Sequence, residues 1–267
     1  MIKFTIVTIT YNAAQVLSRT LESVIAQDYP CVEHIVVDGA STDDTLNIAY
    51  EYKDRSDKSG SGHVVRIQSE PDKGLYDAMN KGLRLATGDY ICYINAGDCL
   101  HSPDTLSLVA SKAMPFVNED DKKCLPAVIY GDTDWTDNNG NYIGKRRLSP
   151  PEHLTWRSFK HGMLVCHQAF YARVDIARNI EYNLEYRHSS DVDWCIRVMK
   201  EAEKRQLPLV NVNQTVADYQ REGQTTKYHR ASLIERFNVM RCHYGLIVTL
   251  SMHVWFLLRA VLKRARS

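Results

Sequence analysis

The stretch Phe4-Thr-Ile-Val-Thr-Ile-Thr10 decides the fold, because it joins apolar and β-branched residues without charge or turn residues. Such a run predicts a strand that is buried on both faces. Downstream, four apolar residues recur at helical spacing on one face: Leu17, Leu21, Val24 and Ile25. A buried strand followed by an amphipathic helix is the repeating unit of an α/β domain with a parallel sheet.

The same unit then repeats. The run His34-Ile-Val-Val-Asp38 predicts a second strand that ends at Asp38. Ser41-Thr-Asp-Asp44 has the pattern of a capping box, so we expect a helix from there through Tyr52, followed by a polar loop at Asp54–Gly62. A strand, a helix and a strand are expected next: Val64–Gln68, Leu75–Ala86 and Asp89–Ile94. Strands that alternate with crossover helices predict an α/β fold with a mainly parallel sheet.

Length and composition are typical of one compact enzyme domain. The chain has 267 residues, of which 44% are hydrophobic and 24% charged, as in ordinary soluble proteins. Its seven cysteines form no CxxC pair, so we expect reduced thiols and a cytoplasmic location. Met1 lies three residues before the first predicted strand, so no leader peptide is expected.

The C-terminal end differs in charge from the rest. No acid follows Glu235, and the last 32 residues carry +6 of a total net charge of +1, which leaves −5 for the preceding 235. Tyr244–Leu258 is apolar over 15 residues, or about 22 Å of helix, short of the ~30 Å hydrocarbon core. Arg259, Lys263 and Arg266 follow on one face. This pattern predicts an interfacial helix, peripheral on the anionic inner face of the plasma membrane; the alternative is packing on its own domain or on a second subunit.

Three aspartates stand where an α/β chain exposes strand ends or opens a helix. Asp38 and Asp98 each close an apolar run, and Asp191 opens the helical stretch Asp191–Met199. Ligands of open parallel sheets bind beyond the carboxyl ends of the strands. The arrangement predicts a phosphate and metal site with a separate base.

Several ordered motifs resemble those of glycosyltransferase family 2. They are Thr8-Ile-Thr-Tyr-Asn12, Ile35-Val-Val-Asp-Gly-Ala-Ser-Thr-Asp43, Ser69-Glu-Pro-Asp-Lys-Gly-Leu-Tyr-Asp-Ala-Met-Asn-Lys-Gly82, Ala86-Thr-Gly-Asp-Tyr90 and Asn95-Ala-Gly-Asp98. The resemblance is strong over residues 3–100 and weaker over 160–225, and within the family it is to bacterial enzymes that build surface polysaccharide.

The resemblance implies a GT-A fold and an inverting transfer of one sugar. The donor would be a nucleoside-diphosphate sugar, most commonly a UDP-sugar, and the acceptor a saccharide hydroxyl, which the C-terminal helix suggests is lipid-linked. We expect residues 1–225 to form the transferase domain, with a nucleotide-sugar half at 1–100 and an acceptor half at 101–225, and residues 226–267 to form a helical, membrane-associating segment.

By the same resemblance, Asp98 matches the last acid of the family's Asp-x-Asp-type motif and would hold Mn²⁺ or Mg²⁺ against the diphosphate. This chain departs from the common pattern, since Gly97 stands where many members have an acid and Asn95 lies two residues earlier. One carboxylate predicts weak metal binding without nucleotide. The alternative is that Asp98 only caps a turn.

The remaining nucleotide contacts are also carried over residue by residue. Asp38 would accept hydrogen bonds from the nucleoside, and Tyr11 would lie against the base. Lys73 and Gly74 would border the nucleotide at a strand-to-helix turn. Each has a structural alternative: a turn aspartate for Asp38, a half-buried tyrosine for Tyr11 and a turn glycine for Gly74.

Asp191 matches the first acid of the family's late acidic motif and is the candidate general base, with Asp193 in reserve. A helix start favours an ionised carboxylate, although Asp191 could instead serve as a helix cap. His167-Gln168 would lie near the acceptor or diphosphate, or would be a hydrogen-bonded structural pair. Tyr219–Thr225 replaces the family's closing segment and lacks the motif of processive members, which favours transfer of one sugar per encounter.

Two other classes of function remain open from the sequence. A nucleotidyltransferase would normally carry a Gly-rich phosphate loop after the first strand, and Tyr11-Asn-Ala-Ala14 offers none. A non-catalytic nucleotide-sugar-binding protein is the second alternative, with Gly97 as the mark of a decayed site. Lys145-Arg-Arg147 is a short basic cluster in a predicted hairpin, and near-neutral charge with no RNA-binding motif predicts no nucleic-acid partner.

Overall fold

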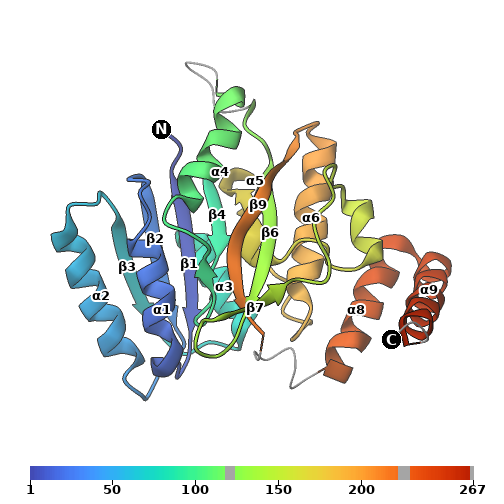
Figure 1. Ribbon diagram of the computed structural model, residues 1–267, viewed down its shortest axis with the longest axis horizontal. Coiled ribbons are helices and arrows are strands. Elements are labelled where there is room, and N and C mark those ends of the chain that lie inside the picture. The colour runs from blue at the N-terminus through green and yellow to red at the C-terminus, as the bar shows by residue number, and fades with distance from the viewer. Residues whose placement is uncertain (118–123, 222–228, 265–267) are drawn as a thin grey trace.

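A single mixed sheet organises the computed structural model, which describes residues 1–117, 124–221 and 229–264 (Figure 1). The strand order is β3-β2-β1-β4-β8-β6-β9-β5, and β7 pairs with β6 at the side. The first four strands in this order pair in parallel: β3 Val64–Ser69, β2 Val32–Asp38, β1 Phe4–Thr10 and β4 Tyr90–Tyr93. The predicted α/β class is confirmed, and the sheet is parallel throughout this half.

The second half of the sheet is mixed. Its strands are β8 Phe170–Arg173, β6 Val128–Thr136, β9 Leu209–Gln220, β5 Cys99–Leu100 and β7 Tyr142–Lys145. β8 runs antiparallel to β4 and β6, β9 runs parallel to β6, and β5 and β7 are antiparallel edge pairings. β6 and β7 form the predicted hairpin, and β7 ends at Lys145, the first residue of the basic cluster.

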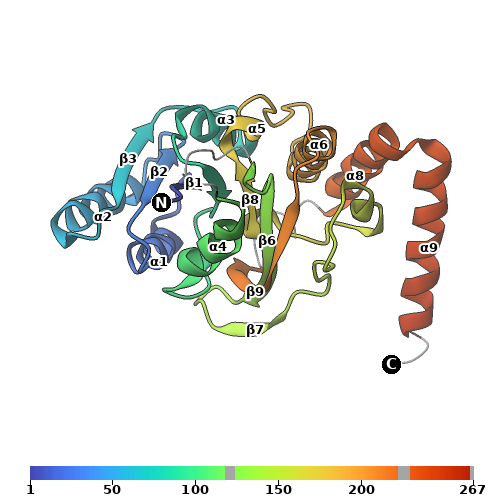
Figure 2. The same cartoon turned by 90° about the horizontal axis from the view of Figure 1, so that it is seen from above.

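Helices cover both faces of the sheet. Those of the first half are α1 Ala14–Ile25, α2 Thr45–Ser59 and α3 Leu75–Leu85. Those that follow are α4 Thr105–Ala113, α5 Val174–Ala177, α6 Ser190–Lys204, α8 His229–Tyr244 and α9 Leu246–Arg264, with short 3₁₀ turns η1 Met114–Phe116, η3 Trp156–His161 and η4 His167–Ala169. Figure 2 shows α1 and α4 on one face and α3, α5 and α6 on the other. This arrangement buries both faces of the central strands.

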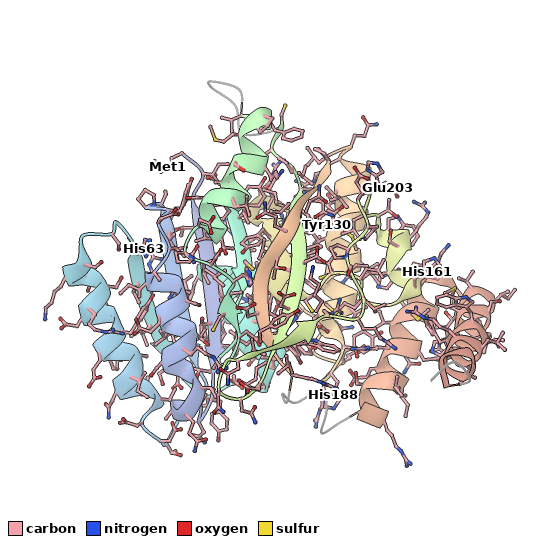
Figure 3. The ribbon with its side chains drawn as sticks, in the orientation of Figure 1. Met1, His63, Tyr130, His161, His188 and Glu203 are labelled. Carbon is pink, nitrogen blue, oxygen red and sulfur yellow. The ribbon has the colours of Figure 1, made fainter. Side chains whose placement is uncertain are left out.

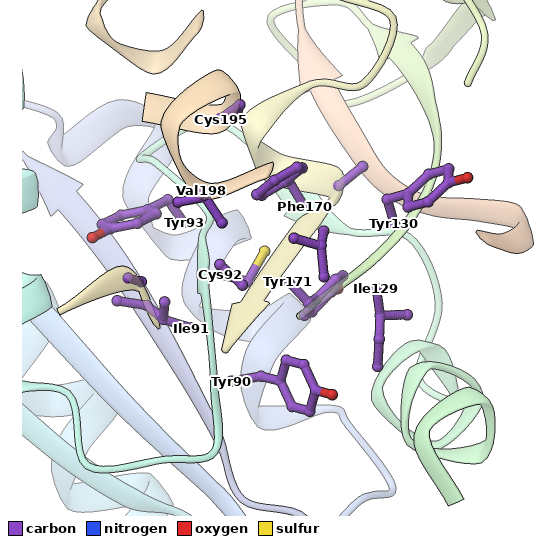
Figure 4. Packing of buried hydrophobic residues seen from close by; sticks show 14 of the residues in the cluster. Tyr90, Ile91, Cys92, Tyr93, Ile129, Tyr130, Phe170, Tyr171, Cys195 and Val198 are labelled. Carbon is purple, nitrogen blue, oxygen red and sulfur yellow. The ribbon is translucent and has the colours of Figure 1, made fainter. Parts of the chain in front are cut away.

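The main core lies where the two halves of the sheet meet. Tyr90, Tyr93, Phe170 and Tyr171 are fully buried there, on β4 and β8, and Trp194 of α6 packs against two of them (Figure 4). Aromatic residues bury large areas and stack edge-to-face. The core therefore fixes β4, and the loop that follows it, against the second half of the chain.

Two predictions in the first half need correction. The capping box at Ser41–Asp44 does not form: Asp44 is the N-cap without a side-chain cap bond, the Ser41 hydroxyl donates to Asp38, and Asp43 accepts from the Thr45 amide at 3.0 Å. Ser41 thus fastens the loop to the end of β2, and it is Asp43 that bonds the first residue of α2.

The predicted polar loop at Asp54–Gly62 is mostly helix. α2 continues to Ser59, and Gly60 ends it with a positive φ of 70°. Two ion pairs at i,i+4 spacing, Lys53–Asp57 and Asp54–Lys58, line its exposed face. Such pairs support a helix that contributes little to the core, which is why a polar composition concealed it.

The C-terminal helices stand apart from the sheet. α8 contacts α6, and α9 contacts α8 and η3; Figure 2 shows α9 at the periphery, on the far side of α8 from the sheet. α9 leaves large apolar side chains in water, among them Ile247, Leu257 and Leu258, which are 82%, 69% and 57% exposed. Within the part of the chain that the structure describes, no helix is both long and apolar enough to cross a bilayer.

Candidate functional site

A cleft of about 400 Å³ opens beyond the carboxyl ends of β1 and β4, a size that fits a small organic ligand. In Figure 3, His188 of its rim lies at the lower edge of the molecule and Met1, which precedes β1, lies toward the top. Polar residues from six segments line the cleft: Asp72, Tyr76, Asn95, Asp98, His167, Gln168, Arg187, His188, Asp191, Gln220 and Arg236. We call this space the cleft below.

Asp98 lies on the floor of the cleft and is 5% exposed. Its Oδ2 accepts a hydrogen bond from Gln168 Nε2 at 2.7 Å, and its Oδ1 accepts one from the backbone amide of Gln220 at 3.0 Å. Burial raises the pKa of Asp98 to about 6, although these hydrogen bonds and the nearby charges of His167 and Arg19 lower it. The carboxyl group is therefore held in place and is poised to ionise when a cation arrives.

The loop around Asp98 explains why a glycine precedes it. Gly97 has a φ of +103°, and a Cβ there would collide with the Gln220 side chain. Arg19 donates to the Gly97 carbonyl at 2.6 Å and to Gln220 Oε1 at 3.0 Å. Gln220 thus fills the space that a second acid would need at position 97.

A second oxygen in the cleft has no protein partner. Asn95 Oδ1 is buried and accepts no hydrogen bond from the residues that the structure describes, while Asn95 Nδ2 lies 3.2 Å from His167 Nε2. An orphaned buried acceptor is costly unless water or an ion satisfies it. Asn95 and Asp98 therefore offer two hard oxygen donors from one loop.

Asp191 enters the cleft from the first turn of α6, behind Ser189 at the N-cap. Its Oδ1 accepts a hydrogen bond from the Tyr76 hydroxyl at 3.0 Å, and its Oδ2 lies 3.4 Å from His167 Nδ1. Burial alone would raise the pKa of Asp191, but His167, the charge of Arg236 and the Tyr76 hydrogen bond outweigh it, so the pKa is lowered. The carboxylate is ionised at neutral pH, as a proton acceptor must be.

η4 connects the two acids. His167 contacts Asp191 and the next residue, Gln168, donates to Asp98. The dipeptide was predicted to lie either near the reacting groups or in a structural role; here it lines the cleft and holds both carboxylates. A shift of η4 would therefore alter the contacts of both acids.

The other predicted site residues divide into two groups. Tyr11, which is 63% exposed, and Gly74, at the N-terminus of α3, line the cleft. Asp38 and Lys73 are not among its lining residues. Asp38 is fully buried, and its carboxylate accepts from the Ser41 amide at 3.0 Å and the Ser69 hydroxyl at 2.6 Å. The geometry of Asp38 is thus that of a turn aspartate, and its contact with a nucleoside stays a prediction.

Asp193, the reserve base, faces elsewhere. Its oxygens pair with Arg197 Nε at 2.7 Å and His243 Nε2 at 2.8 Å, and it does not line the cleft. Of the two acids, only Asp191 reaches the cleft.

The sequence analysis overlooked several cleft residues. Tyr76 lies within the motif Ser69–Gly82, and Gln220 lies within Tyr219–Thr225. Residues 222–225 fall outside the described part of the chain. Arg236 comes from α8, and its buried Nε has no hydrogen-bond partner among the described residues. Glu235 beside it accepts from the amides of Arg187 and His188 at 2.9 and 2.7 Å. No sequence signal ties α8 to the cleft, because the contact spans more than forty residues.

Comparisons with known proteins agree with this geometry. Residues 5–180 match the family model described as glycosyl transferase family 2. A PGL/p-HBAD biosynthesis glycosyltransferase of Mycobacterium bovis is 36% identical over 195 residues, which cover 73% of this chain and 68% of that protein. The amylovoran biosynthesis glycosyltransferase AmsB of Erwinia amylovora is 26% identical over 238 residues, 85% of this chain and 75% of the relative.

Solved structures match the fold. TarS of S. aureus, in complex with UDP-GlcNAc, superposes with a TM-score of 0.67 at 19% identity over 90% of this chain. The chain spans about 65% of the length of the solved TarS fragment, which comprises residues 1–349 of that protein. The mannosyltransferase PcManGT of Pyrobaculum calidifontis, in complex with GDP-Man and Mn²⁺, superposes with a TM-score of 0.61 at 16% identity, over 89% of this chain and 63% of that one. At this low sequence identity, the two matches support the fold alone.

Proposed function

The chain belongs to glycosyltransferase family 2, and we propose that its cleft transfers one sugar from a nucleoside-diphosphate sugar to a saccharide hydroxyl with inversion. The observation that carries this is the ionised, half-buried Asp191, which reaches into the cleft from the start of α6. A single displacement needs a base at the acceptor oxygen and a stabilised diphosphate leaving group. Asp191 supports the first requirement and the Asn95–Asp98 loop the second.

Asp191 would take the proton of the acceptor hydroxyl as that oxygen attacks the anomeric carbon. The Tyr76 hydroxyl orients one oxygen of Asp191, and His167 orients the other. Two fixed hydrogen-bond partners restrict the rotation of the carboxylate, which shortens the search for a reactive geometry. We assign these two residues positioning roles.

We propose Mn²⁺ or Mg²⁺ as the cofactor. Asp98 and the orphaned Asn95 Oδ1 would hold it, because both ions prefer oxygen ligands. When bound, the ion would offset the charge that develops on the leaving diphosphate. Since the chain supplies only one carboxylate there, nucleotide and metal should bind together more tightly than either alone.

Cations on the rim favour a donor with a diphosphate. Arg187 and Arg236 line the cleft together with Asp191, and a guanidinium suits phosphate oxygens. The solved relatives were crystallised with UDP-GlcNAc, UDP and GDP-Man. We favour a UDP-sugar, with Tyr11 and Gly74 on the nucleotide and with Asp38 and Lys73 as neighbours of that site.

The acceptor is proposed to be a lipid-linked saccharide in bacterial cell-surface glycoconjugate synthesis. Two of the relatives, which are named for PGL/p-HBAD biosynthesis and amylovoran biosynthesis, support this proposal. We treat residues 226–267 as the segment that docks on the inner face of the plasma membrane and residues 1–225 as the transferase domain. The exposed apolar side chains of α9 and the net +6 charge of the last 32 residues support that docking. Sedimentation with anionic vesicles should pellet the full chain and leave a chain that ends at Arg241 in solution.

One experiment tests the function directly. UDP-, GDP- and dTDP-sugars are incubated with Mn²⁺, a glycolipid acceptor and the enzyme, and the released nucleoside diphosphate is measured. Release with wild type and its loss in Asp191→Asn are expected, while Asp193→Asn, whose carboxylate lies outside the cleft, should retain activity. Pyrophosphate from a nucleoside triphosphate would instead indicate a nucleotidyltransferase, and binding of the nucleotide sugar with no turnover of any donor would indicate a binding protein.

A further inference from the structure

A second group of metal-ligating side chains lies across three neighbouring strands, outside the cleft. His101 follows β5, Asp218 lies on β9 and Asp134 lies on β6, and β9 runs between the other two strands. Asp134 is directly opposite Asp218 in the ladder. One potential ligand atom of each residue lies within 4.8 Å of the other two. Three strands thus converge on one point at this edge of the sheet.

One carboxylate oxygen of Asp134 is buried without a hydrogen-bond donor among the described residues. Asp134 is 7% exposed, and its Oδ1 accepts no hydrogen bond from the described residues. Lys145 faces Asp134 in the β6–β7 ladder, but Lys145 is exposed. In the described part of the chain, no ion pair within 4.0 Å joins the two side chains. An ionised carboxylate left unpaired inside a protein is costly. A cation at this point would remove that cost.

The other two ligands are already brought together. His101 Nδ1 and Asp218 Oδ1 are 2.8 Å apart, a distance at which they share one proton. Two ligands of a tetrahedral ion are about 3.3 Å apart when each bond is near 2.0 Å. The pair would open by about half an ångström, and the exposed His101 side chain has the freedom to do so. An ion would replace the shared proton.

We propose that His101, Asp134 and Asp218 form a second divalent-cation site that takes Zn²⁺, with water as the fourth ligand. One imidazole and two carboxylates are a donor set that zinc accepts, whereas Mg²⁺ prefers oxygen alone. The ion would tie together β5, β6 and β9. β9 also carries Gln220, whose amide bonds Asp98, so the site supports the strands that frame the cleft without lying in it.

Calorimetry with Zn²⁺ on the chelator-treated full chain, without nucleotide, tests this. Wild type should bind one ion at this site, and Asp134→Asn and His101→Ala should each weaken that binding at least tenfold. His153→Ala removes an exposed histidine far from the cluster in sequence and should leave binding unchanged. Asp98→Asn should also retain it, because Asp98 belongs to the cleft. The Asp134→Asn substitution keeps the size of the side chain, and circular dichroism confirms that each variant is folded.

Two outcomes overturn the proposal. One is the absence of Zn²⁺ binding to wild type, and the other is binding that Asp134→Asn and His101→Ala leave intact. Co²⁺ substitution identifies the ligands independently: a site of nitrogen and oxygen donors gives visible bands without thiolate charge transfer. Thiolate bands would place the ion on the exposed Cys124 or Cys242 instead and would equally reject the site.

Discussion

The parallel half of the sheet and the C-terminal helix pair bury their apolar residues to opposite degrees. Every residue of β1 and β2 is buried, whereas α9 leaves Ile247 82% and Leu257 69% exposed. Both segments are rich in apolar residues. Hydrophobic composition alone therefore does not say whether a segment faces a core, a membrane or water; the partner that covers it decides.

The two regions meet at the cleft. The end of β1 and the loop after β4 line it, and α8 supplies Arg236 and, through Glu235, the position of the loop at Arg187. The parallel half thus provides Asp98 through the loop after β4, α6 provides Asp191, and the helix pair provides charge near that base. The predictions below test this division, from the largest expected effect to the smallest.

Replacing the base should have the largest effect. Asp191→Asn keeps the side-chain size but cannot accept a proton, so transfer should fall by roughly 10²–10⁴-fold. Nucleotide affinity should change little, because the substitution leaves the Asn95–Asp98 loop intact. Initial rates with a genuine acceptor and calorimetry with the nucleoside diphosphate measure the two quantities. Transfer at the wild-type rate would remove Asp191 from the mechanism.

Removing the buried charge of Asp98 should stabilise the protein while abolishing metal-dependent transfer. Its folded-state pKa is about 6 and its ordinary value 3.8, so the folded state keeps the proton over that window and stability falls as pH rises through it. Asp98→Asn mimics the protonated acid and should raise the free energy of unfolding by up to about 3 kcal/mol at pH 7.5. Gln168 can turn its amide to accept from the new NH₂ group.

Urea unfolding at two pH values checks this prediction. The gain should vanish below pH 4, where wild type is itself protonated, and the exposed Asp44→Asn should show no gain at either pH. A destabilised Asp98→Asn at pH 7.5 would mean that its hydrogen bonds outweigh the cost of burial. Mn²⁺ titrations at Asp98 belong in a His101→Ala background, so that the proposed second site does not contribute heat.

The sequence predicted the first region far better than the second. Phe4–Thr10 forms the strand predicted from its apolar run, and the following strands and helices agree to within two residues at most boundaries. The local sequence pattern suffices there, because a strand that is buried on both faces appears as a near-continuous apolar run. It failed at Asp54–Gly62, since α2 has no apolar residue after Tyr52 and carries i,i+4 ion pairs there instead.

The site was predicted only in part, because local sequence patterns do not report contacts between distant segments. Asp98, Asp191, Tyr11 and Gly74 lie in recognisable motifs, and all four line the cleft. Arg236 and the mutual arrangement of the two acids through η4 arise from contacts between distant segments. Such contacts leave no periodic trace in one sequence. Asp38 shows the converse, a motif residue whose local hydrogen bonds satisfy it completely.

A smaller effect is expected from Arg236, which tests whether the helix pair tunes the base. The charge of Arg236 is among the causes that lower the pKa of Asp191. Arg236→Gln should raise that pKa, so the acidic limb of the pH–rate profile should move to higher pH and activity at pH 5–6 should fall more than activity at pH 8. The pH profile of kcat measures this. An equal loss at all pH values would assign Arg236 to substrate binding alone.

The smallest effect on stability should come from the exposed face of α9. Ile247→Ser with Leu257→Ser removes apolar side chains that water already covers, so the free energy of unfolding should change by less than about 0.5 kcal/mol. Ile6→Val, a single methyl lost from the core of β1, should cost about 0.5–1.5 kcal/mol and serves as the contrast. Binding to anionic vesicles should show the reverse order, with a marked loss in the α9 variant and none in Ile6→Val. If the α9 variant is instead the less stable of the two, or shifts the protein from dimer to monomer in sedimentation, a protein surface covers this face and the membrane assignment fails.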